Sequence, residues 1–250
     1  MARDHKPFRR HVRQHARLLA ASTAALAIGG TALVEVPASA AARPKGHDVS
    51  SHQKNVNWSK ARSKGAKFVY VKATESHTYR NPYFAQQYDG SRDAGILRGA
   101  YHFALPHKSS GTKQAAYFLR NGGGWRADGW TLPPALDIEY NPYGKKKCYG
   151  LSKAGTVGWI KAFSNEVKRQ TGRRPVIYTN YNWWKTCTGN SAAFAANHPL
   201  WLARYSASAG SLPSGWGHWT FWQYDNSGAL PGDQNLFNGS LSRLKSFARG

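Results

Sequence analysis

Residues 132–142 read LPPALDIEYNP, an apolar run that ends in two carboxylates, Asp137 and Glu139, placed two positions apart. In an extended strand residues i and i+2 project from the same face, with backbones about 6.6 to 6.8 Å apart. Two like charges so placed repel each other. This repulsion, together with partial burial, is expected to raise one pKa and leave the other low, which is what general acid chemistry requires.

The rest of the chain alternates short apolar runs with segments of helical period. Strand–helix repetition with short links predicts parallel pairing, and seven or eight such strands predict an α/β fold closed into a barrel. After residue 175 the pattern has more strand and less helix, so we expect a distorted barrel. The expected strands are 47–49, 68–72, 97–103, 135–138, 175–178, 200–203 and 220–223, and the expected helices are 58–64, 83–93, 112–119, 156–171 and 191–196.

The first 40 residues are typical of a secretory signal peptide. A basic segment, an apolar segment and the small-residue site Pro37-Ala38-Ser39-Ala40 follow one another. A membrane anchor is the alternative, but Glu35 and Pro37 interrupt a stretch that is short for a span. We therefore expect cleavage after Ala40, one catalytic domain over 41–250, an extracellular location and no stable insertion in a membrane.

The chain is strongly basic, with 35 Lys and Arg against 12 Asp and Glu. The leader holds six of the bases and two of the acids, so the remaining chain keeps a net charge of +19 out of +23. Such a charge favours a polyanionic partner, and for an exported protein this is an anionic cell wall rather than nucleic acid. Solubility alone is the alternative reason for the charge. We expect a monomer.

The only two cysteines are Cys148 and Cys187. In an exported protein such a pair is typical of a disulfide, and closing this loop would stabilise the fold by about 4 kcal/mol in the chain-entropy model. Neither their number nor their spacing suits a zinc site, and we expect no metal or cofactor.

In a parallel barrel the functional groups collect at the carboxyl ends of the strands. Six of the acids outside the leader would face that mouth, and the polar residues His102, Tyr178 and Gln223 also lie at strand ends. A basic protein that gathers acids in one cleft is suited to stabilising a developing cation, such as an oxocarbenium-like transition state. The six acids are Asp48, Glu75, Asp137, Glu139, Asp225 and Asp233.

Several of these residues also have a structural interpretation. Asp48 could cap a strand, Glu75 could pair with a neighbouring Lys or Arg, and His102 could be a hydrogen-bonded core histidine. Asp225 and Asp233 could be turn formers. The chain is rich in aromatic residues, with 13 Tyr and 10 Trp. Most of these rings belong to packing, but Tyr101, Tyr178 and Trp222 are our candidates for stacking on sugar rings.

Taken in order, the motifs resemble the secreted lysozymes of glycoside hydrolase family 25, which cleave the bond between N-acetylmuramic acid and N-acetylglucosamine in peptidoglycan. The resemblance spans nearly all of 41–250, and it lies in the order and spacing of the motifs. They are GHDVS at 46–50, YVKATE at 70–75, RGAYHF at 98–103, LDIE at 136–139, VIYT at 176–179, WLA at 201–203, FWQY at 221–224 and DQNLF at 233–237.

The resemblance implies a flattened barrel of five βα units followed by antiparallel strands. It also implies that Glu139 is the general acid, that Asp137 steadies the cation or orients the substrate's N-acetyl group, and that Asp48 and Asp233 complete the acidic cleft. Glu75, Tyr101, His102, Tyr178, Trp222, Gln223 and Asp225 are then expected to bind substrate. Cys148 with Cys187 corresponds to a disulfide of close relatives.

The spacing of the acid pair leaves the mechanism open, because its side chains could reach either the separation of a direct nucleophile or that of a water-mediated inversion. We favour a retaining route in which the substrate's N-acetyl carbonyl attacks the anomeric carbon. A chitinase-like glycosidase and a non-catalytic cell-wall lectin are the alternative functions. Nucleic-acid binding, suggested by charge alone, predicts a steeply salt-sensitive affinity for DNA.

Overall fold

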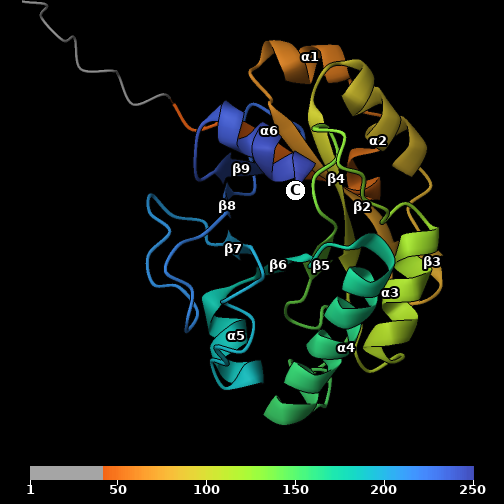
Figure 1. Ribbon diagram of the computed structural model, residues 1–250, viewed down its shortest axis with the longest axis vertical. Helices are drawn as coiled ribbons and strands as arrows, with labels where there is room; N and C mark the ends of the chain where they lie inside the picture. Colours follow the sequence, from red (N-terminus) through yellow and green to blue (C-terminus); the bar gives the residue numbers. More distant parts are fainter. Residues whose placement is uncertain (1–41) are drawn as a thin grey trace, which may run out of the picture. The chain divides into compact units, whose positions relative to one another are not determined.

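The apolar runs of the sequence form a closed barrel of eight strands in the computed structural model, which describes residues 42–250 (Figure 1). The order around the barrel is β1-β9-β8-β7-β6-β5-β4-β2, and parallel pairing of β1 with β2 closes it. A short strand, β3, pairs with β2 alone among the named strands. The strands are β1 Lys45–Val49, β2 Phe68–Glu75, β3 Tyr79–Arg80, β4 Leu97–Phe103, β5 Ala135–Asp137, β6 Val176–Thr179, β7 Leu200–Ala203, β8 Phe221–Asp225 and β9 Asp233–Phe237.

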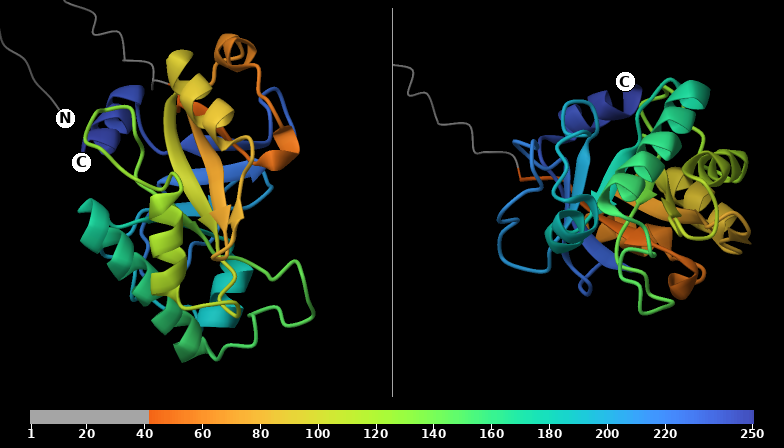
Figure 2. Two further views of the ribbon diagram at one scale, coloured as in Figure 1. Left: turned by 90° about the vertical axis from the view of Figure 1, so that its right-hand side faces the viewer. Right: turned by 90° about the horizontal axis from the view of Figure 1, so that it is seen from below.

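Five helices follow the first strands and lie on the outside of the barrel, as Figure 2 shows. They are α1 Trp58–Ser63, α2 Phe84–Asp93, α3 Gly111–Arg120, α4 Lys153–Thr171 and α5 Tyr181–Thr188. No helix separates β7 from β8 or β8 from β9, and a last helix, α6 Leu241–Arg249, follows β9. The predicted distorted α/β barrel of five βα units is therefore confirmed. Its antiparallel pairing is confined to β9, which runs against both β8 and β1.

The structure differs from the expected helices in two places: α6 was not expected, and one expected helix is misplaced. Residues 191–196 were expected to be helical, but they form turns, with backbone bonds such as Ala195 N–H to the Ala192 carbonyl. The helix lies earlier, at Tyr181–Thr188. The side chain of Asn180 accepts from the Trp183 N–H at its start, and Gly189 ends it in the left-handed conformation.

The inside of the barrel is filled by alternate residues of its strands, in the period-2 pattern that puts every second side chain on one face. Tyr70 occupies the centre, where its ring stacks on Trp201 at 4.7 Å and its hydroxyl donates to the Pro133 carbonyl. Gly99 lies opposite Tyr70 on β4, and a Cβ there would come within 2.3 Å of the Tyr70 ring. The absence of a side chain at Gly99 is what admits so large a ring.

The amino-terminal end of the barrel is closed by α6, whose Leu244 and Ala248 are fully buried in the same interior cluster. Two further apolar clusters lie outside the strands. One packs β4–β7 against α3, α4 and α5, and the other packs β1 and β2 against α1 and α2. The interior of the barrel is therefore open to polar groups at its carboxyl end.

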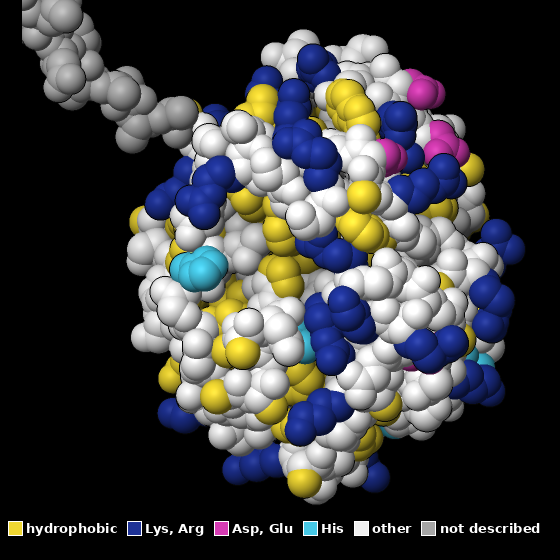
Figure 3. All heavy atoms as spheres, viewed as in Figure 1, with side chains coloured by type: hydrophobic (Ala, Val, Ile, Leu, Met, Phe, Trp, Pro, Cys, Tyr) yellow, Lys and Arg dark blue, Asp and Glu magenta, His cyan; other side chains and the backbone are white. Residues whose placement is uncertain are grey.

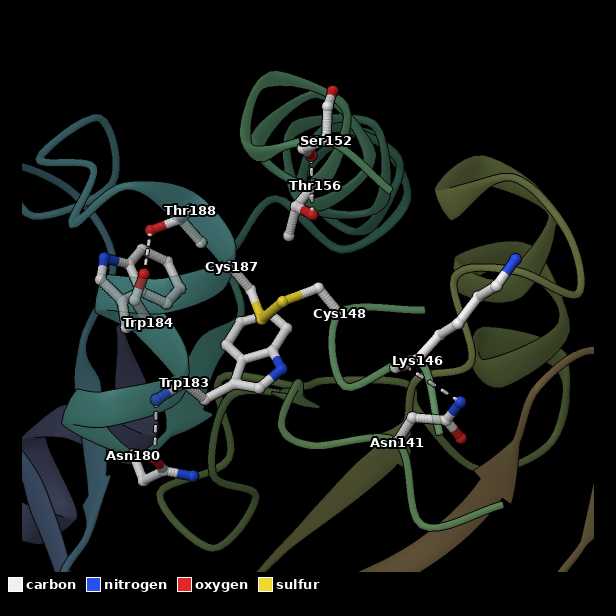
Figure 4. The surroundings of a disulfide bond; sticks show 10 residues. All are labelled: Asn141, Lys146, Cys148, Ser152, Thr156, Asn180, Trp183, Trp184, Cys187 and Thr188. Carbon is white, nitrogen blue, oxygen red and sulfur yellow. Dashed lines mark hydrogen bonds between the residues drawn. A yellow bond between two sulfur atoms is a disulfide. The ribbon is translucent and has the colours of Figure 1, made fainter. Parts of the chain in front are cut away.

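The predicted disulfide between Cys148 and Cys187 is confirmed, with Cα atoms 5.3 Å apart. It ties the loop after Glu139 to α5, beside the indole ring of Trp183 (Figure 4). The loop that leaves the acid pair is thus anchored at its far end.

The predicted leader, residues 1–40, lies outside the described residues, so the leader and the boundary of the catalytic domain stay predictions. Within residues 42–250, no helix has the length and apolar character needed to cross a membrane.

Candidate active site

The acid pair of the opening motif points into one cleft at the carboxyl ends of the strands. Strand β5 ends at Asp137, and Glu139 follows two positions later, while Ile138 between them is fully buried in the outer cluster under the helices. Asp137 and Glu139 both line a hollow of about 220 Å³ together with Asp48 and Asp233. The two acids therefore lie on the same face, as expected.

Asp48 and Asp233 lie opposite each other on the antiparallel pair of β1 and β9. One oxygen of Asp48, Oδ2, accepts from Gln223 Nε2 at 2.9 Å and from Asn235 Nδ2 at 2.7 Å. Asn235 is held in turn by the indole N–H of Trp201, which donates to Asn235 Oδ1 at 2.7 Å. The carboxylate of Asp48 is thus fixed by two amides that donate to it.

Gln223 joins the two sides of the cleft. Its Nε2 donates to Asp48 and, at 3.2 Å, to Asp233 Oδ2, while its Oε1 accepts from the hydroxyls of Tyr178 at 2.8 Å and Tyr205 at 3.2 Å. The amide is almost completely buried. Strands β1, β6, β8 and β9 therefore contribute to one hydrogen-bonded network, which holds the side chains of Asp48 and Asp233 in place.

Burial raises the pKa of all four acids. The pKa of Asp48 is raised to about 7 by burial and by the charge of Asp233, and that of Glu139 to about 7 by burial and by Asp233, although Lys72 opposes the rise. The pKa of Asp137 is raised well above its usual value by burial and by Glu139. We expected one member of the pair to keep a low pKa, and that expectation is wrong because both acids lose water.

Asp137 has a further feature. Its Oδ1 is buried and has no hydrogen-bond partner among the described residues. A buried carboxyl oxygen without a donor is costly, by about 1 to 3 kcal/mol. A ligand that brings an N–H group to this oxygen would remove that cost, and the oxygen can accept whether or not the other oxygen carries a proton.

A second hollow, of about 610 Å³, adjoins the first and shares Glu139 and Tyr178 with it. Glu139 thus lies between the two hollows. Its carboxyl group would reach a bond of a chain-like ligand that occupies both hollows. The remaining lining of the second hollow is mostly polar, and it comprises Asn180, Tyr181, Asn182, Leu202, Ala203, Arg204, Tyr205 and Ser211.

Tyr101, Tyr178 and Gln223, expected to bind substrate, do line the cleft. Two other residues expected in that role, His102 and Trp222, do not line it. His102 is fully buried among Phe118 and Phe163 on the outer face of β4, where Thr74 and Gln114 bond its ring nitrogens and burial lowers its pKa to about 3.

Trp222 also points outward, and its indole N–H donates to the Arg204 carbonyl. Both errors have the same physical origin. His102 and Trp222 neighbour the inward-facing residues Tyr101 and Gln223, so they belong to the opposite face of their strands.

Two acids that were expected to bind substrate, Glu75 and Asp225, also lie outside the lining of the cleft. Glu75 does not line the cleft, and it pairs with Lys72 at 2.7 Å, which is the structural alternative considered for it. Asp225 accepts from the N–H and hydroxyl of Ser227, as a turn former does. The pairing of β8 with β9 shifts its register between Gln223 and Asp225. The alternation of side chains that turns Gln223 inward therefore does not extend to Asp225.

Several residues of the site were not among the candidates from the sequence, and four of them matter most for the acids. Lys72 lines the cleft, Asn235 donates to Asp48, and Trp201 donates to Asn235. Tyr205 donates to Gln223 and, at 3.4 Å, to Asp233. Lys72 lies two positions after the inward-facing Tyr70 on β2, so the alternation of side chains along a strand would have predicted it in the cleft. Tyr205 lies in a loop after β7, and nothing in the local pattern of that loop marks it.

Residues 42–250 hold no group of three or more His, Cys, Asp or Glu side chains arranged to bind a metal ion. Asp48 and Asp233 accept hydrogen bonds from amides and a hydroxyl, and the charge of Lys72 acts on Asp137 and Glu139, so these acids are suited to proton transfer and to stabilising positive charge.

Comparisons with known proteins agree with this geometry. Residues 47–233 match the model of the family described as Glycosyl hydrolases family 25. Lysozyme M1 of Streptomyces globisporus is 49% identical over 209 residues, covering 82% of this chain and 71% of the relative. The N,O-diacetylmuramidase of a Chalaropsis species is 48% identical over 210 residues, covering 82% and 99%.

Solved structures are equally similar. A muramidase from Acremonium alcalophilum superposes with a TM-score of 0.81 at 52% identity, covering 83% of this chain and all of that one. A family GH25 lysozyme from Aspergillus fumigatus gives 0.81 at 49% identity, covering 82% and 99%. With an acid cleft at the carboxyl end of a distorted barrel and a family match across nearly the whole described domain, this chain belongs to the glycosyl hydrolases of family 25.

Proposed function

We propose that this protein is a muramidase, which hydrolyses the bond between N-acetylmuramic acid and N-acetylglucosamine in bacterial peptidoglycan. The observation that carries the proposal is that Asp137, at the end of β5, and Glu139, just after it, line one cleft in a family 25 domain, with Glu139 between two hollows. Relatives named lysozyme and N,O-diacetylmuramidase, at 49% and 48% identity, favour this substrate over chitin and an enzyme over a lectin.

In the proposed reaction Glu139 is the general acid. Its pKa of about 7 keeps a proton available near neutral pH, and the proton passes to the glycosidic oxygen as the bond from that oxygen to the anomeric carbon breaks. The pair of electrons of that bond goes to the leaving oxygen. The remaining acids of the cleft stabilise the positive charge that develops on the sugar.

Asp137 is proposed to orient the N-acetyl group. The amide N–H would donate to the unpartnered Oδ1, which aims the amide carbonyl oxygen at the anomeric carbon, where it forms a new bond on the side opposite the leaving group. Water, deprotonated by the Glu139 carboxylate, then displaces this oxygen. Two displacements at one carbon retain the configuration.

Asp48 and Asp233 are proposed to complete the catalytic group, held by Gln223 and Asn235. Tyr101, Tyr178 and Gln223 are proposed to contact the sugar. We further propose that residues 1–40 direct export, that the cleaved protein acts outside the cell as a monomer on anionic walls, and that it needs no cofactor.

The direct test is the identity of the products. Purified peptidoglycan and chitin oligomers are digested separately, and the fragments are analysed by mass and by the sugar at the new reducing end. A muramidase releases fragments of peptidoglycan that end in N-acetylmuramic acid. Fragments ending in N-acetylglucosamine, or faster cleavage of chitin, would contradict the proposal, and binding without any new reducing ends would indicate a lectin.

A further inference from the structure

A hollow of about 370 Å³ lies apart from the acid cleft and is lined by three arginines, Arg92, Arg98 and Arg126; we call it the arginine pocket. We propose that the arginine pocket binds oxyanionic groups, phosphate or carboxylate, and that it holds the protein on the anionic polymer of the wall while the cleft acts elsewhere. The proposal that the anion belongs to a cell wall rests on the proposed function, whereas the proposal of an anion site does not.

The arginine pocket belongs to the amino-terminal end of the barrel. Arg98 is the second residue of β4, Thr131 precedes β5, and residues 122–128 belong to the loop between α3 and β5. Glu139 and Asp233 line the cleft at the other strand ends. A ligand in the arginine pocket is therefore out of reach of the reacting bond and leaves the cleft free.

The charge of the arginine pocket is unbalanced. Its one acid, Asp128, bonds Arg92 at 3.2 Å and also accepts from the backbone N–H groups of Trp130 and Thr131 and from the Thr131 hydroxyl. These bonds lower the pKa of Asp128 against the effect of burial, so it is ionised and its oxygens are occupied. Arg98 and Arg126 form no ion pair with any acid in residues 42–250.

Arg98 provides the strongest observation. Its Nε and Nη1 are buried and donate to no acceptor in the described part of the chain, although the guanidinium lies 4.4 Å from the centre of the Tyr88 ring. A buried N–H group without an acceptor costs about 1 to 3 kcal/mol. A phosphate or carboxylate accepts two parallel N–H bonds from one edge of a guanidinium, either Nε with Nη2 or Nη1 with Nη2, so such a group would give an acceptor to one of the two unpartnered atoms.

The arginine pocket can admit more than a small ion. Its floor carries the rings of Phe84, Tyr88 and Trp125, and its rim includes Gly124, where an added Cβ would meet no atom within 4 Å. Open space beside two unpaired arginines suits a charged group on a longer chain. An exposed cation, Arg126, completes one side of this rim.

Binding of the wall polymer at the arginine pocket would raise the effective concentration of that polymer at the cleft. A protein held at the arginine pocket finds the next bond in its cleft without diffusing away, which raises the rate on an insoluble wall but not on a short soluble fragment. The overall positive charge of the protein would also attract the protein to walls, but this attraction would not depend on one arginine. The difference between specific and general attraction is what the experiment must measure.

The first experiment measures binding without turnover. Sodium phosphate and sodium acetate are titrated separately at constant ionic strength, and the Nε–Hε signal of Arg98 is followed by NMR. We expect this signal to shift with a saturating curve. We also expect Arg126→Gln to weaken the binding about three- to tenfold, because one charged donor is lost. Lys185→Gln on α5 removes the same charge from an exposed helix position and should leave the affinity unchanged.

Two results would overturn the site: an Arg98 signal that does not move with either anion, or equal weakening by Arg126→Gln and Lys185→Gln. Preference for phosphate points to phosphodiester polymers, and preference for acetate points to the carboxylates of peptide stems. Either preference supports an oxyanion site.

The second experiment tests the role of the site. Digestion of insoluble walls, with and without chemical removal of phosphodiester polymers, is compared with digestion of soluble glycan fragments. We expect Arg126→Gln to slow digestion of the walls about threefold or more and to leave digestion of the fragments unchanged. Equal rates for Arg126→Gln and wild type on both kinds of wall would overturn the tethering role. If wild type cleaves neither substrate while phosphate still shifts Arg98, the proposed function fails and the anion site stands.

Discussion

Glu139 lies at the meeting point of the two hollows, and its environment decides at which pH it can act. Loss of water and the neighbouring Asp233 favour the protonated form, and Lys72 acts in the opposite sense. A general acid must carry its proton at the start of the reaction. The pKa of about 7 therefore sets the upper pH limit of activity.

From this pKa we expect kcat/KM on soluble glycan fragments to fall about tenfold per pH unit above about pH 7, since the protonated fraction of Glu139 falls in that ratio. The measurement is a pH–rate profile at constant ionic strength. Lys72→Met removes the charge that lowers the pKa, so the falling limb should move to higher pH. A limb that stays in place, or that moves to lower pH, would show that another group sets it.

Single residues of the site were predictable to the extent that strand alternation applies. Asp137, Tyr178 and Gln223 each lie two positions after an inward-facing core residue, and all three line the cleft. Asp48, two positions after Gly46, also lines it. His102 and Trp222 failed because strand-end position alone does not say which face a side chain takes. Tyr205 could not be predicted, since a loop brings it to the network from outside any periodic pattern.

At the scale of elements, the barrel depends on the close approach of β2 and β4. The Tyr70 ring occupies the space in which Gly99 would otherwise carry a side chain. Packed interiors tolerate little added volume, because neighbouring side chains must leave their preferred rotamers. Tyr70 cannot move away easily, since it is held by Trp201 and by the Pro133 carbonyl.

We expect Gly99→Ala to lower the free energy of unfolding by about 1 to 3 kcal/mol, through overpacking against Tyr70. Urea unfolding followed by tryptophan fluorescence measures it. The matched control is Gly158→Ala within α4, where an added Cβ meets nothing within 4 Å, and where Ala should stabilise by about 0.5 to 1 kcal/mol. Equal effects of the two substitutions would contradict this account of the barrel interior.

Two of the elements that the sequence pattern missed, β9 and α5, share a physical reason. Strand β9 begins with Asp233-Gln234-Asn235, residue types that are poor strand formers, and it forms because β1 and β8 offer partners on both sides. Helix α5 contains two adjacent tryptophans, Trp183 and Trp184, both fully buried, so its helical period is hidden by apolar neighbours. In each case tertiary contacts outweigh local preference.

At the scale of the whole molecule, the barrel is closed at one end and open at the other. Helix α6 covers the amino-terminal end with Leu244 and Ala248, and polar groups occupy the carboxyl end. Lys and Arg side chains are spread over the face drawn in Figure 3, where Asp and Glu side chains gather mainly near α2. A face so rich in positive charge suits the anionic wall that we propose as the substrate.

The closing role of α6 predicts that Leu244→Ala destabilises the whole barrel by about 2 to 5 kcal/mol, because it leaves a cavity in a fully buried site. Leu241 lies on the same helix but is 36% exposed, and Leu241→Ala should change stability by less than about 0.5 kcal/mol. Thermal unfolding of the two variants measures the difference. A small effect of Leu244→Ala would mean that the barrel stands without its closing helix.

The account rests most directly on Glu139 as the proton donor. The decisive measurement is kcat on purified peptidoglycan for Glu139→Gln, with Glu166→Gln, a surface acid of α4, as the control. We expect Glu139→Gln to lower kcat by about 10² to 10⁴ with unfolding midpoints that are not reduced, and Glu166→Gln to keep wild-type turnover. Wild-type turnover by folded Glu139→Gln would contradict the account.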